Sequence, residues 1–262
     1  MQRQATYIDK HMTTKTDNGK KLKVLIFDIE TAPNIGYTWT KWETNVIEFI
    51  TERYMLCFAA KWLDEKQTVV HSLPDFKGYT KDKTNDKELV KKLWALMDEA
   101  DVVVAHNGDK FDIKVMNARF AVNGLTPPSP YKTVDTCKVA RGKFGFNSNK
   151  LNDLGKVLGF GGKFETGGFA LWKGCMAGEK ASWTKMKKYN KIDVTLLEKV
   201  YLALRPWMPQ HPNVGINKGR HACNHCASTK TQNRGFSYAK VHKYQRYQCQ
   251  DCYAWGSAPI KK

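Results

Sequence analysis

The chain has 262 residues, enough for one domain of about 200 residues with a full core and a small additional module. Lys and Arg number 43 against 25 Asp and Glu, so the formal net charge is +18 and we expect a nucleic-acid partner. A solvated, lysine-rich surface is the alternative. No stretch approaches the roughly 18 apolar residues of a membrane span, and no apolar signal-peptide core follows Met1–Gln4. We therefore expect a cytoplasmic protein with no membrane partner.

The pattern of apolar and β-branched residues predicts an α/β fold. A loose polar arm over residues 1–20 precedes a strand at about 22–29, and strands at 54–63 and 67–73 suggest an antiparallel meander. A helix beginning after Asn85 or Asp86 leads to a buried strand at 101–105, and this order predicts a mixed sheet with parallel members. Further expected elements are a helix that ends at Gly124, a strand at 131–136, a helix that begins near Ser148 and a long helix at 182–204.

Two carboxylates leave the first strand one residue apart. Side chains alternate along a strand, so Asp28 and Glu30 lie on the same face. Residues 24–27 are all apolar, which is typical of a central strand covered on both faces, where carboxylates are costly without a cation beside them. A divalent metal removes that cost. A strand that ends in two solvated acids is the alternative.

Two further acids come from predicted helices. Asp112 falls in the first turn of a helix after a buried strand, at the strand end where open α/β sheets bind ligands. Taken alone, it is better explained as an acid that interacts with the helix dipole. Asp193 shares the inward, apolar face of the long helix with Tyr189, one turn before it. An acid on that face needs a partner, either a metal or an unidentified Lys or Arg.

A glycine-rich stretch covers residues 159–168. Its Gly162-Lys163 pair is not a phosphate-binding loop, because Phe164 occupies the Ser/Thr position and no strand precedes it. Glycine adds backbone freedom, so we expect a mobile loop at the rim of a cleft.

Taken together, three motifs resemble those of the DEDD 3′→5′ exonucleases. They are Phe27-Asp28-Ile29-Glu30-Thr31, Asn107-x-x-x-Phe111-Asp112 and Tyr189-x-x-x-Asp193. Because its third motif carries a tyrosine, the chain resembles most the subgroup of these enzymes that includes the proofreading domains of family A and B DNA polymerases. The resemblance covers about residues 22–204 and implies a ribonuclease H-like fold with two Mg²⁺ or Mn²⁺ ions at the carboxylates.

The resemblance also implies a role for each motif residue. Asp28 would bridge both metals, and Glu30 and Asp193 would complete the shell of the first metal. Asp112 would hold the second metal directly or through water, and Tyr189 would orient the attacking water. The residues expected to support or bind the substrate beside them are Thr31, Asn107 and Phe111.

Four of the seven cysteines form a metal-binding pattern. The pairs Cys223-x₂-Cys226 and Cys249-x₂-Cys252 match the spacing of a structural Cys₄ zinc site and resemble a zinc ribbon. Two disulfides are the alternative, and they conflict with the absence of a secretory signal. The other three are expected to be core residues or unpaired thiols: Cys57, Cys137 and Cys175.

The module that carries these cysteines is strongly basic. Residues 211–262 hold nine Lys and Arg against one acid, Asp251. Aromatic residues alternate with cations there, which suits stacking on bases and contact with phosphates, so we favour a nucleic-acid tether over a small ribbon core with solvated cations. The residues expected to contact substrate are Arg234, Phe236, Tyr238, Lys240, Lys243, Tyr244, Arg246, Tyr247 and Trp255.

These features predict four regions: an arm at 1–20, a ribonuclease H-like exonuclease domain at 21–205, a Pro-rich linker at 206–217 and a zinc-ribbon-like module at 218–262. The expected activity is removal of nucleotides from the 3′ ends of single-stranded DNA, in replication, proofreading or repair, with a polymerase or replisome partner left open. A ribonuclease of the same fold and a non-cleaving nucleic-acid adaptor are alternatives. A transposase-type enzyme fits the second and third motifs poorly.

Overall fold

A mixed five-stranded sheet forms the centre of the protein. The structure is a computed structural model that describes residues 21–63, 65–162, 164–219 and 221–260, so the arm expected over residues 1–20 lies outside the described residues. The strands lie in the order β5-β4-β1-β6-β7. Their bounds are Val24–Thr31 for β1, Met55–Trp62 for β4, Val69–Ser72 for β5, Val102–Ala105 for β6 and Lys132–Asp135 for β7.

Both kinds of strand pairing expected from the sequence are present. β1 runs antiparallel to β4, and β4 runs antiparallel to β5, which is the predicted meander. β1 is parallel to β6, and β6 is parallel to β7. The carboxyl ends of β1, β6 and β7 therefore share one edge of the sheet, the edge at which α/β proteins bind ligands. The predicted α/β fold with a mixed sheet is confirmed.

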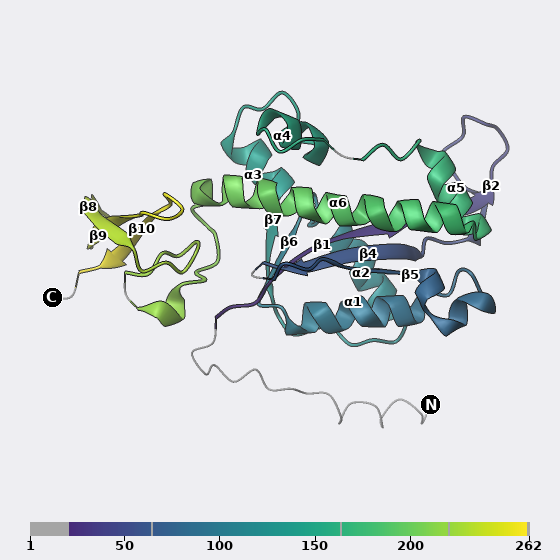
Figure 1. The fold of residues 1–262 in the computed structure, drawn as a ribbon, viewed down its shortest axis with the longest axis horizontal. Helices are drawn as coiled ribbons and strands as arrows, with labels where there is room; N and C mark the ends of the chain where they lie inside the picture. The colour runs from purple at the N-terminus through teal and green to yellow at the C-terminus, as the bar shows by residue number, and fades with distance from the viewer. Residues whose placement is uncertain (1–20, 64, 163, 220, 261–262) are drawn as a thin grey trace, which may run out of the picture.

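Helices cover both faces of the sheet (Figure 1). The longest helix, α6, crosses one face, with α3, α4 and α5 on the same side, and α1 and α2 lie on the other face. Their bounds are Lys87–Glu99 for α1, Asp112–Val122 for α2, Thr136–Lys143 for α3, Leu151–Val157 for α4, Phe169–Ala177 for α5 and Lys180–Leu204 for α6.

Alternation along β1 separates the two halves of the core. Val24 and Ile26 belong to the apolar cluster that α6 covers, whereas Leu25 and Phe27 belong to a second cluster with α1 and α2. Because Asp28 and Glu30 continue the series of Val24 and Ile26, they lie on the face of the sheet that α6 covers.

Three features differ from the sequence-based expectation. α3 begins at Thr136, inside the predicted strand 131–136, because the Asp135 side chain accepts two backbone N–H groups of the helix's first turn. α5 is a short helix whose residues are almost all apolar, so it shows no amphipathic period. The strands β2 (Ile35–Tyr37) and β3 (Glu48–Thr51) form a separate hairpin, whose largely exposed residues give no alternation of apolar and polar positions.

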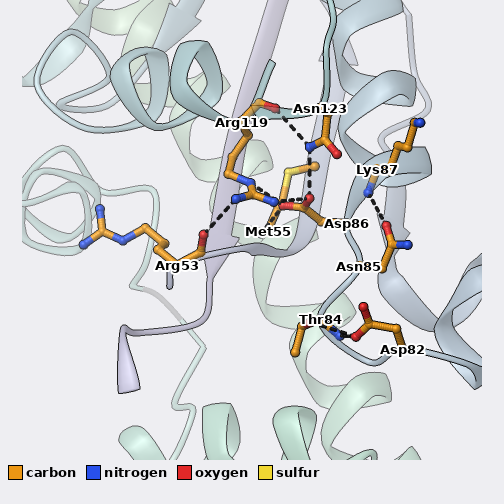
Figure 2. Close-up of polar contacts among 9 residues, drawn as sticks. All are labelled: Arg53, Met55, Asp82, Thr84, Asn85, Asp86, Lys87, Arg119 and Asn123. Carbon is orange, nitrogen blue, oxygen red and sulfur yellow. Dashed lines mark hydrogen bonds and ion pairs between the residues drawn. The ribbon is translucent and has the colours of Figure 1, made fainter. Parts of the chain in front are cut away.

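A buried ion pair joins α1, α2 and β4 (Figure 2). The Asp86 carboxylate is fully buried and accepts hydrogen bonds from Nε and Nη2 of Arg119 at 2.8 and 2.6 Å. It also accepts the Met55 backbone N–H at 2.8 Å and the Asn123 side-chain amide at 3.1 Å. Asp86 is the residue before α1, as predicted, but its side chain binds these neighbours instead of capping the helix.

The C-terminal module is a small three-stranded antiparallel sheet. Its strands are β8 (Thr231–Tyr238), β9 (Lys243–Cys249) and β10 (Trp255–Pro259), in the order β10-β9-β8. The module lies beyond the C-terminal end of α6 (Figure 1). Within the described residues, no helix is long and apolar enough to cross a membrane.

We predict that Arg119→Met lowers the free energy of unfolding by about 3–5 kcal/mol, because it leaves the Asp86 charge buried without its cation. The measurement is chemical denaturation at neutral pH. Lys114→Met, on an exposed position of the same helix, is the matched control and should change stability by less than about 0.5 kcal/mol. Equal stabilities of the two variants would contradict a structural role for this ion pair.

Candidate active site

Three carboxylates from two elements meet on the α6 face of the sheet. Asp28 and Glu30 leave β1, Asp193 leaves the middle of α6, and one oxygen of each lies within 4.8 Å of the others. Asp193 is fully buried, and the two acids of β1 are half-buried. Three like charges so close together, partly shielded from water, favour a bound cation.

The fourth predicted acid lies beside this group. Asp112 is 3 % exposed at the start of α2, and its Oδ1 accepts the backbone N–H of Ile29 at 3.3 Å. Ile29 is the residue between Asp28 and Glu30, so the second motif is bonded directly to the first. Asp112 is not among the carboxylates that meet within 4.8 Å, and its bond to Ile29 is to the strand backbone.

Asn190 is a component of the site that the sequence reasoning missed. Its side-chain amide donates to the Asp28 carboxylate at 2.7 Å and more weakly to the Asp28 carbonyl at 3.4 Å. Its carbonyl oxygen accepts the Cys57 thiol at 3.6 Å, and Asn190 is fully buried. A polar residue three positions before Asp193, on the inward face of α6, is the sequence signal that reveals it.

Tyr189 is held against the acids. Burial, and then the nearby Glu30, Asp193 and Asp28 carboxylates, raise the pKa of its phenol, and a hydrogen bond with the Asp193 side chain adds to the shift. The ring of Trp172 packs against it edge-on, with centroids 6.1 Å apart. The phenol therefore stays protonated and acts as a hydrogen-bond donor at the site.

The loop before α2 is fixed by a neighbouring acid. Asn107 has a φ of 62°, a left-handed conformation that is uncommon outside glycine, and its backbone N–H donates to Asp135 Oδ1 at 2.9 Å. Asp135 also caps α3, so one buried carboxylate orders both the second motif and the next helix. Phe111, the last residue before α2, lies half-buried under the Arg53 guanidinium, 5.5 Å from its ring centroid.

Comparison with known families agrees with this geometry. A family model described as the RNase H superfamily matches residues 25–205, a range that holds the five-stranded sheet except for Val24, the carboxylate group and, among the described residues, every α-helix. The chain belongs to the RNase H superfamily. A search among curated proteins found no significant match. Membership in this superfamily supports metal-dependent nuclease chemistry on nucleic acid, and all three motifs lie within the matched RNase H domain.

The carboxylates of the RNase H domain fit a hard divalent cation. Mg²⁺ and Mn²⁺ prefer oxygen ligands, and here three carboxylates, from Asp28, Glu30 and Asp193, offer oxygens from two directions. The hydrogen bond from Asn190 orients the Asp28 carboxylate, as outer-shell groups do at metal sites.

The four C-terminal cysteines fit a different cation. The sulfur atoms of Cys223 and Cys252 lie 3.5 Å apart, and those of Cys226 and Cys249 lie 3.6 Å apart. A tetrahedral zinc site with Zn–S bonds of about 2.3 Å requires sulfur–sulfur distances of about 3.8 Å, whereas a disulfide requires about 2 Å. The cluster is therefore compatible with a zinc ribbon. The other three cysteines are buried free thiols, as expected: Cys57, Cys137 and Cys175.

Contacts through the linker dock this module on the RNase H domain. Tyr201 of α6 donates its hydroxyl to His211 Nε2 at 2.8 Å, while His211 Nδ1 donates to the Pro212 carbonyl at 2.7 Å. The His211 ring stacks on His225, with centroids 5.2 Å apart, and His225 Nε2 donates to the Met208 carbonyl at 2.9 Å. The Pro-rich segment after α6 thus packs against both neighbours.

The predicted substrate-binding residues of the module differ in their exposure. Tyr247 is 1 % exposed and donates its hydroxyl to Ala222 and Asn224, so it belongs to the module's interior, contrary to the expectation that it contacts substrate. Lys243 lies over Phe236, 3.9 Å from the ring centroid, and shares a face with Tyr238, its partner in the β8–β9 register.

The remaining pair lies on the other face of the same sheet. Arg246 lies 5.9 Å from the Trp255 ring centroid, and because it follows Lys243 by three residues along β9, alternation puts the two side chains on opposite faces. The aromatic and basic residues therefore form two separate surfaces. Apart from the half-buried Tyr244, the rest of the predicted set is exposed: Arg234, Phe236, Tyr238, Lys240, Lys243, Arg246 and Trp255.

We predict that His211 makes stability depend on pH. Burial lowers the pKa of His211 to about 4, so the folded protein keeps it neutral, whereas the unfolded chain takes up a proton below about pH 6.5. This contribution is fully present above pH 6.5 and is lost as the pH falls toward 4, which costs about 2 kcal/mol at pH 5. Chemical denaturation at pH 7.5 and pH 5 should show a larger loss of unfolding free energy in the wild type than in His211→Gln. Any loss caused by zinc release is the same in both proteins and cancels in this comparison. Equal losses in the two proteins would contradict the role of His211.

Proposed function

We propose that the protein is a metal-dependent 3′→5′ exonuclease that removes nucleotides from single-stranded DNA ends. The observation that carries the proposal is the meeting of Asp28, Glu30 and Asp193 carboxylates within 4.8 Å, with the protonated Tyr189 phenol beside them. The order and spacing of the three motifs support the 3′→5′ direction through their resemblance to DEDD exonucleases. Replication, proofreading or repair are the settings that supply such ends, with a polymerase as the kind of partner that generates them.

Each residue has a role that follows from its position. Asp28 and Glu30, fixed on a central strand, hold cations at a constant place, and Asp193 closes the site from the helix side. Divalent cations bound there supply a more acidic water and stabilise negative charge on the leaving oxygen of a phosphodiester. Asp112 anchors the second motif to β1 through the Ile29 backbone N–H, and its carboxylate would help to hold a second cation.

Tyr189 and Asn190 bond to two different carboxylates of the site, Asp193 and Asp28. The raised pKa of Tyr189 keeps its phenol available as a donor that orients a water or a phosphate oxygen. Asn190 fixes the rotamer of Asp28 through its amide, so the carboxylate presents the same oxygen throughout turnover.

The C-terminal module is proposed to hold one structural Zn²⁺ and to tether the substrate strand. Its exposed cations and aromatics suit contact with phosphates and bases. Because the linker packs on α6, this tether has a fixed place relative to the RNase H domain.

We predict that Asp28→Asn and Asp193→Asn each lower the cleavage rate more than about 100-fold, because each removes a charged metal ligand. The measurement is single-turnover cleavage of 3′- and 5′-end-labelled single-stranded DNA and RNA with Mg²⁺, Mn²⁺ or chelator. Glu88→Gln, an exposed acid on the opposite face of the sheet, is the matched control and should cleave as the wild type does. Tyr189→Phe should cost less than either ligand change.

Several outcomes of this experiment would contradict the proposal. Cleavage in chelator, or wild-type rates in Asp28→Asn, would remove the metal mechanism. Binding without any cleavage would make the protein an adaptor, and a strong preference for RNA ends would make it a ribonuclease of the same fold.

A further inference from the structure

A groove lies between α2 and the β2–β3 hairpin. Its volume is about 480 Å³, and it is lined by α2, by Lys110 and Phe111 before that helix, and by Phe49 and Arg53 on the hairpin side. Ligand pockets commonly have volumes of about 300–1,000 Å³. The lining includes none of the four acids of the candidate active site, and of the motif residues Phe111 alone borders it. The groove is therefore a feature separate from the carboxylate group.

The apolar part of the groove is a stripe on α2. Val115, Ala118 and Val122 follow one another at positions i, i+3 and i+7 and line the groove together. The buried stripe of the same helix is a different one, since Met116 and Phe120 pack into the core. Val122 keeps 69 % of its surface exposed. Thus α2 is apolar on a side that faces away from the core as well as on the side that faces it.

The hairpin extends this apolar surface. Phe49 of β3 lines the groove and is exposed, and the segment between the two strands carries Trp39 and Trp42, whose side chains are 82 and 85 % exposed. A two-stranded hairpin is at best marginally stable in water unless something packs on it. A concentration of exposed apolar side chains marks an interaction site. The groove and the hairpin together therefore have the character of a docking surface.

One end of the groove is basic. Its lining holds four cations and one acid, Glu52. Arg119 is one of the four, and the buried Asp86 carboxylate neutralises it (Figure 2). The other three cations gather near the start of α2, where Arg53, Lys110 and Lys114 lie. Val122 is eight residues beyond Lys114, or about 12 Å along the helix, so the groove is basic at one end and apolar at the other.

This pattern suits an acidic peptide better than a nucleic-acid strand. Bases bind single-strand sites by stacking on aromatic rings. The aliphatic stripe of α2 offers no ring, and the Arg53 guanidinium already lies over Phe111, 5.5 Å from its centroid. An apolar helix side with a charged end is instead the kind of groove that seats an amphipathic peptide segment.

We propose that this groove docks a short segment of a partner protein in which large apolar side chains lie next to Asp or Glu. The apolar side chains pack on the stripe from Val115 to Val122, and the acids bind Arg53, Lys110 and Lys114. The partner is thus recognised by an acidic, amphipathic segment. This interaction goes beyond the proposed nuclease reaction and does not depend on it.

The test selects peptides against the full-length protein. A phage library of random 12-residue peptides is panned on the wild type, and the enriched peptides are synthesised and measured by isothermal titration calorimetry. Val122→Ser changes the apolar end of the groove, and Lys114→Glu reverses a charge at the basic end. Val157→Ser is the matched control for the first variant, since Val157 is the last residue of α4 and 65 % exposed, as Val122 is the last residue of α2. Lys91→Glu, at an exposed position of α1, is the control for the second.

The enriched peptides should combine large apolar residues with acids. Val122→Ser should weaken their binding about fivefold, because it removes apolar contact area. Lys114→Glu should weaken it about tenfold at low salt, and this loss should shrink at 0.5 M salt because the interaction is ionic. Both control variants should bind as the wild type does, and circular dichroism verifies that all four variants are folded.

Two outcomes would overturn the docking groove. One is a selection that yields no peptide whose affinity falls in Val122→Ser and Lys114→Glu relative to their controls. The other is a groove that binds nucleic acid: a labelled ten-nucleotide oligo(dT), measured without added Mg²⁺ or Mn²⁺, would then displace the peptides and bind Lys114→Glu more weakly than Lys91→Glu. Neither measurement involves cleavage, so failure of the exonuclease proposal leaves this inference standing, and its own failure leaves the exonuclease proposal intact.

Discussion

The packing of α6 across β1 is the interaction on which the rest of the structure depends. Val24 and Ile26 of β1 lie in the same apolar cluster as Val194 and Leu197 of α6, and this contact sets the height and rotation of the helix. The same contact brings Asp193 to the carboxylates that follow on β1. Apolar burial thus stabilises an arrangement of like charges that is unfavourable by itself, and a divalent cation offsets the remaining repulsion.

One helix also links the two candidate metal centres. Asp193 and Tyr201 are eight residues apart on α6, which is about 12 Å at 1.5 Å per residue. Tyr201 contacts His211, His211 stacks on His225, and the His225 backbone N–H donates to the Cys223 sulfur at 3.4 Å. A module that looks separate in sequence is therefore held against the same helix that closes the carboxylate group.

The sequence alone predicts the sheet and the acids because both depend on strong, local patterns. The continuous apolar run of β1 identifies a central strand, and the apolar stripe of α6 places Asp193 on its inward face. The elements that escape prediction lack such patterns. α5 is apolar nearly all round, the β2–β3 hairpin is largely exposed, and α3 begins within a segment of strand-like composition because Asp135 caps it.

Contacts between side chains are harder to predict than helices and strands, since they depend on which side chains meet in the folded protein. The hydrogen bond from Asn190 to Asp28 joins residues 162 positions apart, and no local pattern specifies it. Tyr247 alternates with cations as a base-stacking residue does, yet it is buried and its hydroxyl bonds to Ala222 and Asn224 inside the module. The groove between α2 and the β2–β3 hairpin is likewise visible only once the hairpin is placed beside α2.

The central claim is that β1 and α6 together build a divalent-cation site. The most direct test is anomalous diffraction from crystals of the full chain grown with Mn²⁺. The account predicts a strong anomalous peak within coordination distance of the Asp28, Glu30 and Asp193 carboxylates. A well-ordered site with no peak there, and with a lysine or arginine side chain paired to the three acids instead, would contradict it.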